Sequence, residues 1–169
     1  MRFDGLLWEC LLPGRHEHSE ENLTAALDPR PGETVLLFET DRPAFRRRLP
    51  AGSKLSVCDL MFFYRGPAAP MPVLLFVELK GSDYEHAEEQ LANALEAVTR
   101  ELEPDCQRSV LKGAVVVLGA STPHDSKRRR REFFRSTRTL IEYESNARAK
   151  RTELRSHLEK FVANADSRP

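Results

Sequence analysis

The 169-residue sequence has no long apolar run, because no stretch approaches the roughly 18 consecutive apolar residues of a membrane-spanning helix. The first residues, MRFDGLLWECLLPG, also lack the basic end and uninterrupted apolar centre of a signal peptide, since Asp4, Glu9 and Cys10 fall inside them. The sequence therefore predicts a cytoplasmic protein without a membrane partner.

Cysteine is scarce, with only Cys10, Cys58 and Cys106 in the whole sequence. The three are odd in number, far apart and without C-x-x-C spacing, which argues against a disulfide framework or a zinc site. We expect them to be reduced packing residues. The sequence also lacks a G-x-S-x-G motif, a P-loop and a dinucleotide-binding fingerprint, so the best-known hydrolase and nucleotide-binding signatures are missing.

A net charge is missing as well, since 26 Lys and Arg balance 26 Asp and Glu. The charges are segregated, however: residues 83–105 hold eight acidic residues and one arginine, whereas residues 127–155 hold eleven Lys or Arg and four Glu. A neutral total excludes a uniformly basic protein but allows a basic binding face. The length predicts one domain over 1–169, with a core at about 19–120 and a basic helical part at about 126–164.

Hydrophobic periodicity predicts a mixed α/β fold. Helices are expected at 20–27 after a Ser19 cap, at 83–103, at 126–136 after a cap at Ser121 or Ser126, and at 147–163. Strands are expected at 33–40, 54–64, 73–80 and 113–121, and TLIEYES is either a short strand or the start of a helix. The Pro- and Gly-rich RGPAAPMP turn should join the second and third strands as a hairpin. This order of elements predicts an α/β sandwich with a mixed sheet.

The third predicted strand, VLLFVELK, ends with two charges among apolar residues. Alternate side chains of a strand share a face, so Glu78 and Lys80 should lie on the face of Phe76. Asp59 lies inside the second predicted strand in the same way. If the hairpin pairs the two strands, Asp59 and Glu78 approach each other across it. Buried charges of this kind need a partner, a solvent-filled cleft or a metal ion.

Clustered carboxylates repel each other unless a cation lies between them, and their oxygens suit Mg²⁺ or Mn²⁺. An ammonium group beside such a metal can orient the attacking water and stabilise the charge that develops on a phosphate. Asp59, Glu78 and Lys80 therefore predict metal-dependent phosphodiester hydrolysis. The plain alternative is that Glu78 and Lys80 form a solvated ion pair at the strand end while Asp59 caps a turn.

In these residues the sequence resembles the PD-(D/E)xK nuclease superfamily. The stretch KGSDY, followed by Gln90, is also similar to the Holliday-junction-resolvase and RecB-type members of that superfamily. Asp59 and the triplet Glu78-Leu79-Lys80 match the motif, although Cys58 stands where the family has proline. The resemblance implies a restriction-endonuclease-like α-β-β-β-α-β core with a mixed central sheet and C-terminal helices. It also implies a Mg²⁺- or Mn²⁺-dependent nuclease, with DNA favoured over RNA as the substrate.

The resemblance implies further site residues. Many members carry a glutamate on the first helix, for which Glu20 is the candidate and Glu21 the alternative. Some carry a glutamine on the helix after the lysine strand, and Gln90 fits that position as a residue that orients the lysine or the phosphate. The metal ligands implied in this way are Asp59, Glu78 and Glu20.

Basic residues outside this cluster are candidates for holding the phosphate backbone of nucleic acid without much sequence reading. They are Arg46, Arg47, Arg48, Lys127, Arg128, Arg129, Arg130 and Arg131. A solvated helix face explains the run at 127–131 equally well. The HEH stretch at 16–18 is predicted to be an exposed loop rather than a metal site.

A nuclease of this size has little room for a separate recognition domain. We therefore expect a homodimer that cuts two strands, or a protein partner that supplies specificity. The alternative function is a catalytically inactive member of the same fold that acts as a nucleic-acid- or protein-binding subunit. Loss of metal binding would distinguish the two functions.

Overall fold

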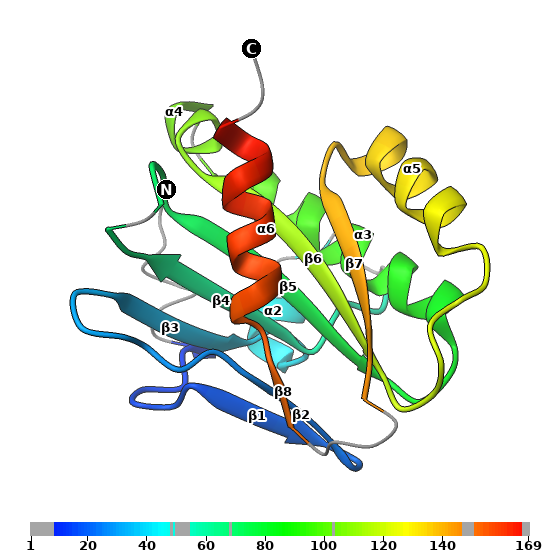
Figure 1. The fold of residues 1–169 in the computed structure, drawn as a ribbon. Coiled ribbons are helices and arrows are strands. Elements are labelled where there is room, and N and C mark those ends of the chain that lie inside the picture. Colours follow the sequence, from blue (N-terminus) through cyan, green and yellow to red (C-terminus); the bar gives the residue numbers. More distant parts are fainter. Residues whose placement is uncertain are drawn as a thin grey trace.

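The computed structural model describes residues 9–47, 49, 55–67, 69–102, 104–146 and 151–166 (Figure 1). A five-stranded mixed sheet comprises β3 (Thr34–Glu39), β4 (Leu60–Arg65), β5 (Val73–Lys80), β6 (Leu111–Leu118) and β7 (Leu140–Ser145), in that order. A three-stranded sheet comprises β1 (Glu17–Glu20), β2 (Leu23–Ala26) and β8 (Arg151–Glu153). The helices are α2 (Pro43–Arg46), α3 (Tyr84–Glu101), α4 (Pro104–Arg108), α5 (Ser126–Thr137) and α6 (Arg155–Asp166).

The central sheet combines an antiparallel half with a parallel half. Strands β3, β4 and β5 are antiparallel neighbours, and β6 and β7 run parallel to β5. Strands β5 and β6 are buried on both faces, which explains their nearly continuous apolar sequences. The predicted hairpin through the RGPAAPMP turn is confirmed, because β4 and β5 pair with Leu60 opposite Val77.

Each face of this sheet is covered by a separate layer. Helices α3 and α5 pack on the face that carries Leu74, Phe76 and Val116. Helix α6 and the small sheet cover the opposite face, as Figure 1 shows for α6. The helix predicted at 83–103 is confirmed as α3, and its face with Ala87, Leu91 and Leu95 is buried. Asp83 caps the helix by accepting a hydrogen bond from the backbone N–H of His86.

The helix predicted at 20–27 is wrong, because these residues belong to the β1–β2 hairpin. Glu21 has a φ of 53°, the left-handed conformation that a tight hairpin turn requires. Ser19, predicted as a helix cap, instead forms a 2.7 Å hydrogen bond to Thr24 across the hairpin. The buried side chains of β2 fill the core under the sheet, and β2 also pairs with β8, so tertiary packing overrides the local helical periodicity.

Other boundaries also differ from prediction. The strand predicted at 113–121 is β6, which begins at Leu111 and ends at Leu118. Strand β4 begins only at Leu60, because residues 55–58 do not pair with the neighbouring strands; residue 54 lies outside the described residues. The helix predicted at 147–163 is β8 followed by α6, and 147–150 lie outside the described residues. The N-cap position of helix α5 is occupied by Asp125 rather than by Ser121 or Ser126, and the Asp125 side chain makes no capping hydrogen bond. TLIEYES contains strand β7.

The HEH stretch is not a loop throughout, because Glu17 and His18 belong to β1. Within the described part of the chain, no helix has both the length and the apolar character needed to cross a membrane.

Candidate functional site

The β4–β5 ladder places Asp59 and Glu78 beside each other at one end of the sheet. Leu60 lies opposite Val77, so Asp59, the residue before β4, meets Glu78 at the next position. Glu78 Oε2 accepts a hydrogen bond of 3.2 Å from the backbone N–H of Asp59. Asp59 Oδ2 accepts one of 2.7 Å from the backbone N–H of Leu79. Each carboxylate is thus held by the backbone beside the other acid, and the two predicted residues do converge.

Lys80 and Gln90 lie next to this pair. Lys80 Nζ is 3.7 Å from Glu78 Oε1 and donates a hydrogen bond of 3.4 Å to Gln90 Oε1. The amide nitrogen of Gln90 donates to the carbonyl oxygen of Val57 at 3.1 Å. Because Gln90 comes from α3 and is itself buried, it positions the lysine against the sheet.

A polar cavity of about 200 Å³ opens over these groups. Its lining residues are Glu20, Glu21, Asp41, Asp59, Glu78, Leu79, Lys80, Gly81 and Gln90. Lys80 is therefore the single cation among five acidic residues in the described lining. Both first-helix candidates reach the cavity, but from the end of β1 and from the hairpin turn rather than from a helix.

Burial, with a smaller effect of neighbouring negative charge, raises the pKa values of the two central acids. Burial raises the pKa of Asp59 to about 7, and the charge of Glu20 adds to this effect. Burial raises the pKa of Glu78 to about 9, with the charge of Asp59 adding to it and that of Lys80 opposing it. Without a cation, the cluster therefore retains protons at neutral pH.

The segment before Asp59 is fixed by side chains instead of strand pairing. Thr40, which is fully buried, donates its hydroxyl to the Cys58 carbonyl, and its backbone N–H donates to the Asp59 carbonyl at 2.8 Å. Asn93 of α3 donates to the Ser56 carbonyl at 2.9 Å. Sequence reasoning missed Thr40 and Asn93 as positioning residues. A polar residue at a strand end and one inside a helix gave no signal that would single them out.

Among the residues that the structure describes, no three or more His, Cys, Asp and Glu side chains form a ready metal cluster. Asp59 and Glu78 form a converging pair, and Glu20 acts on both through its charge. The available donors are carboxylate oxygens, without any histidine or cysteine in the cavity lining. This donor set fits Mg²⁺ or Mn²⁺ and not zinc.

Comparisons with models of protein families, with curated protein sequences and with solved structures gave no match. The chemistry of the site has to be inferred from its own geometry.

The predicted basic residues of α2 and its surroundings are mostly engaged in ion pairs. Arg46 is paired with Asp41, which itself lines the cavity. Arg47 lies 3.6 Å from Glu9. Arg48 lies outside the described residues.

The predicted basic residues of α5 fall into two groups. Arg129 is largely buried: it pairs with Glu85, Glu88 and Asp125, and its guanidinium stacks 4.3 Å from the Tyr84 ring centroid. It therefore fastens α5 to the first turns of α3. Arg130 forms an ion pair of 3.1 Å with Glu142 and so links α5 to β7.

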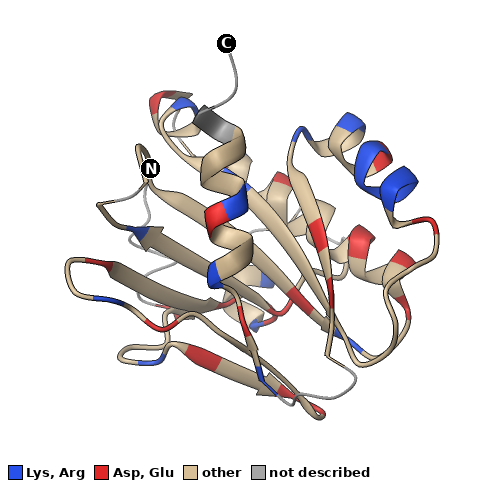
Figure 2. Cartoon of the chain, in the orientation of Figure 1, with Lys and Arg blue, Asp and Glu red and all other residues tan. Residues whose placement is uncertain are grey.

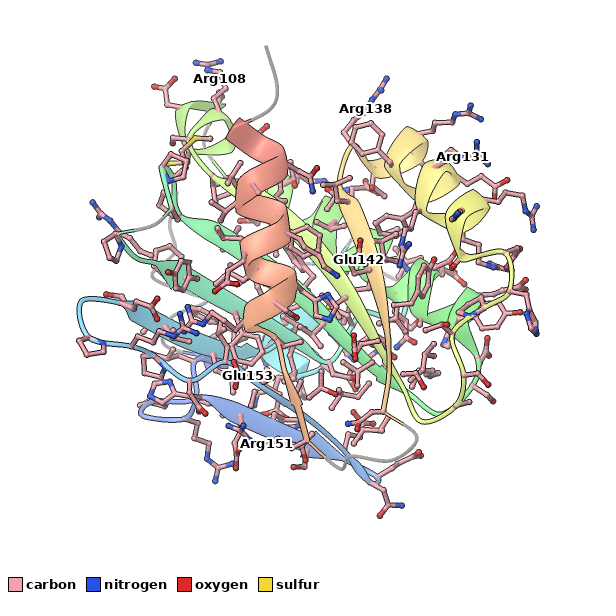
Figure 3. The ribbon with its side chains drawn as sticks, in the orientation of Figure 1. Arg108, Arg131, Arg138, Glu142, Arg151 and Glu153 are labelled. Atoms are coloured by element: carbon pink, nitrogen blue, oxygen red, sulfur yellow. The ribbon has the colours of Figure 1, made fainter. Side chains whose placement is uncertain are left out.

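The other group faces the solvent. Lys127, Arg128 and Arg131 are exposed, as are Arg135 and Arg138, two residues that the sequence analysis did not single out. Figure 2 shows Lys and Arg concentrated along α5, and Figure 3 shows Arg131 and Arg138 projecting away from the sheet. We call these five residues the α5 basic face.

Proposed function

We propose that this protein is a metal-dependent nuclease that hydrolyses phosphodiester bonds, with DNA as the expected substrate. The observation that carries the proposal is the convergence of Asp59, Glu78 and Lys80 in one polar cavity, where Gln90 holds the lysine. Acids this deeply buried and this close together are costly to the fold, which is a common sign of a functional site.

The order of elements supports a restriction-endonuclease-like core. The three antiparallel strands β3, β4 and β5, the crossover helix α3 and the parallel strand β6 correspond to the β-β-β-α-β part of that core. In place of its first helix this chain has the β1–β2 hairpin, which brings Glu20 to the cavity.

The metal would be held by Asp59 and Glu78, with Glu20 as a third ligand. A bound Mg²⁺ or Mn²⁺ supplies a Lewis acid for the phosphate and lowers the pKa of a coordinated water. It would also offset the repulsion that raises the pKa values of Asp59 and Glu78 in the metal-free protein.

The chain itself would orient the reactants and stabilise charge. Lys80, held by Glu78 and Gln90, points its ammonium into the cavity, where it would orient the attacking water and stabilise negative charge on the phosphate. Because Gln90 acts on the lysine through a hydrogen bond, it is a positioning residue for Lys80.

Binding of the substrate would be largely electrostatic. The acidic cavity repels a polyanion, so the attraction must come from elsewhere, and the α5 basic face is the exposed concentration of positive charge among the described residues that best suits this task. Such contacts hold the backbone without reading sequence. A second copy of the chain, or a protein partner, would supply the second cut or the specificity, and the expected compartment is the cytoplasm.

A non-catalytic binding subunit is the competing function. It is favoured by one observation: both acids already accept hydrogen bonds from the backbone, so the pair could be purely structural. The two functions differ in what the cluster does with a divalent cation.

The deciding experiment incubates the protein with labelled single-stranded DNA, double-stranded DNA and RNA in Mg²⁺, Mn²⁺ or EDTA. The nuclease should cut at least one substrate with a metal and none in EDTA. Lys80→Met should remove the cutting, whereas Lys160→Met, which neutralises an exposed lysine of α6, should not. Absence of cutting on every substrate, together with absence of Mn²⁺ binding in calorimetry, would favour the binding subunit.

A further inference from the structure

A second cavity, of about 550 Å³, lies between α3 and the C-terminal end of α5, above the start of β6. It shares no lining residue with the proposed catalytic cavity. Lys112 of β6 lines it, whereas Lys80 pairs with Leu118, six residues further along the same strand. At about 3.3 Å per residue, the two cavities are separated by roughly 20 Å along the sheet.

Lys112 is the unusual residue of this cavity. It follows the alternation of Ala114 and Val116, so it emerges from the sheet face that α3 and α5 cover. Its ammonium donates a hydrogen bond of 3.1 Å to the Thr99 hydroxyl, and no carboxylate among the described residues pairs with it. Burial lowers the pKa of Lys112, because it disfavours the charged ammonium.

Lys112 is the main donor that the lining offers to a ligand. The hydroxyl groups of Ser136 and Thr137 already donate to the Phe133 carbonyl, and that of Thr139 donates to the Thr137 carbonyl. The amide nitrogen of Gln107 donates to the carbonyls of Thr99 and Leu102. Arg100 and Glu96 also line the cavity, but they form an ion pair of 2.6 Å and cancel. The net charge of the lining is therefore that of Lys112, which is positive.

Two exposed arginines, Arg135 and Arg138, are adjacent in sequence to the lining residues 136, 137 and 139. Arg138 has a φ of 57° at the C-cap of α5, a left-handed position where glycine or asparagine is the usual choice.

We propose that this cavity binds a phosphoryl group carried by a ligand of nucleotide size. A phosphate supplies a counter-charge for Lys112 and accepts hydrogen bonds from its ammonium. The volume lies within the roughly 300–1,000 Å³ range of small-molecule sites. The ligand is either a free nucleotide or the phosphorylated end of a nucleic-acid strand. The site does not depend on the proposed nuclease activity.

Calorimetric titrations in EDTA test the site apart from any metal-dependent cutting. The titrants are AMP, adenosine, inorganic phosphate, and a short oligonucleotide with and without a 5′-phosphate. AMP should bind at least roughly tenfold more tightly than adenosine, since a charge-assisted contact is lost without the phosphate. Tighter binding of the 5′-phosphorylated oligonucleotide than of AMP identifies a strand end as the ligand, and the reverse order identifies a free nucleotide.

Substitutions of the lining residues test whether AMP binds in this cavity. Lys112→Met, which keeps the aliphatic stem, should weaken AMP binding by roughly tenfold or more, and Lys160→Met on the opposite face of the sheet should leave it unchanged. Thr99→Val removes the hydroxyl that orients Lys112 and should weaken binding several-fold; it replaces Lys112→Met if that variant fails to fold. Amide NMR shifts on AMP addition should cluster at 99, 112 and 136–139.

Two results would overturn this site. One is the absence of binding by AMP, phosphate and the phosphorylated oligonucleotide at millimolar concentrations. The other is equal affinity of wild type and the Lys112 or Thr99 variants, or NMR shifts confined to the cavity around Asp59 and Glu78.

Discussion

The side chains of Asp59 and Glu78 each accept a hydrogen bond from the backbone beside the other residue. The backbone N–H of Asp59 donates to the Glu78 carboxylate at 3.2 Å, and the N–H of Leu79 donates to the Asp59 carboxylate at 2.7 Å. This reciprocal arrangement fixes two buried acids side by side. Their burial is a structural cost of the metal-free protein, and a bound divalent cation would offset it.

The stability of the metal-free protein should fall as the pH rises between about 4 and 9. In the folded state the pKa values of Asp59 and Glu78 are raised, to about 7 and about 9, by burial and by repulsion. Raised acids bind protons more tightly in the folded chain than in the unfolded one, so their stabilising effect is complete at low pH and is lost as the pH rises through the folded pKa values. Urea unfolding in EDTA, repeated at several pH values in this range, measures the free energy of unfolding and shows whether it falls.

Glu78→Gln is the control for this pH dependence, because it removes one of the two acids. Most of the fall attributable to the pair should disappear in the variant, and Mn²⁺ should flatten the pH dependence of the wild type. An equally steep fall in the variant would show that other groups cause it.

Glu20→Gln should weaken Mn²⁺ binding by roughly tenfold, a loss typical of one charged contact. Glu20 lines the cavity and acts on both central acids, whereas Glu17, on the same strand, pairs with Arg151 instead. Glu17→Gln is therefore the matched control and should bind Mn²⁺ normally. Calorimetry of the two variants, with Glu21→Gln beside them, decides which glutamate is the third ligand. Normal binding by Glu20→Gln would remove Glu20 from the site.

Much of this arrangement follows from sequence pattern. The period of two in VLLFVELK correctly placed Glu78 and Lys80 on the face of Phe76, and the proline-rich turn correctly predicted the hairpin that brings Asp59 to Glu78. The prediction that Glu20 lies on a helix was wrong. It followed from SEENLTAAL, in which the apolar residues have a helical spacing. The hairpin depends on pairing with β8, more than a hundred residues away in the chain, and no local pattern reveals such pairing.

Roles that depend on three-dimensional contacts were equally hidden. Arg129 and Arg131 are neighbours in one basic run, but the first is buried against Tyr84 and the second is exposed. A helix rotates successive side chains by about 100°, so one run supplies both a structural contact and a solvent-exposed basic face. The position of α3 determines which arginine is buried and which is exposed.

Arg155→Met should destabilise the fold by about 3 kcal/mol, because it leaves a buried carboxylate without its partner. Arg155 donates two hydrogen bonds to Glu33, at 2.8 and 2.7 Å, and both side chains are less than 10% exposed. The pair fastens α6 to the start of β3. Arg30→Met breaks an exposed pair with Glu159 and should cost under about 1 kcal/mol in the same denaturation assay. Equal effects would contradict the structural role of Arg155.

Arg131→Met should weaken DNA binding in EDTA a few-fold and lower the slope of log Kd against log salt by about one, the value for one lost phosphate contact. Arg131 belongs to the α5 basic face, and Arg108, an exposed arginine of α4, lies apart from it in Figure 3. Arg108→Met should leave the slope unchanged. Fluorescence anisotropy at several salt concentrations makes the comparison, and identical slopes for the two variants would exclude α5 as the binding face.

The most direct test of the central claim is the rate of Mn²⁺-dependent DNA cleavage by wild type, Glu78→Gln and Glu89→Gln. The two variants carry the same substitution, one in the buried pair and one on the exposed surface of α3. A catalytic cluster predicts that the wild type and Glu89→Gln cut at similar rates, and that Glu78→Gln loses cutting by roughly a hundredfold or more. Cutting by Glu78→Gln at the wild-type rate, with its fold intact, would contradict a catalytic role for Glu78 and Asp59.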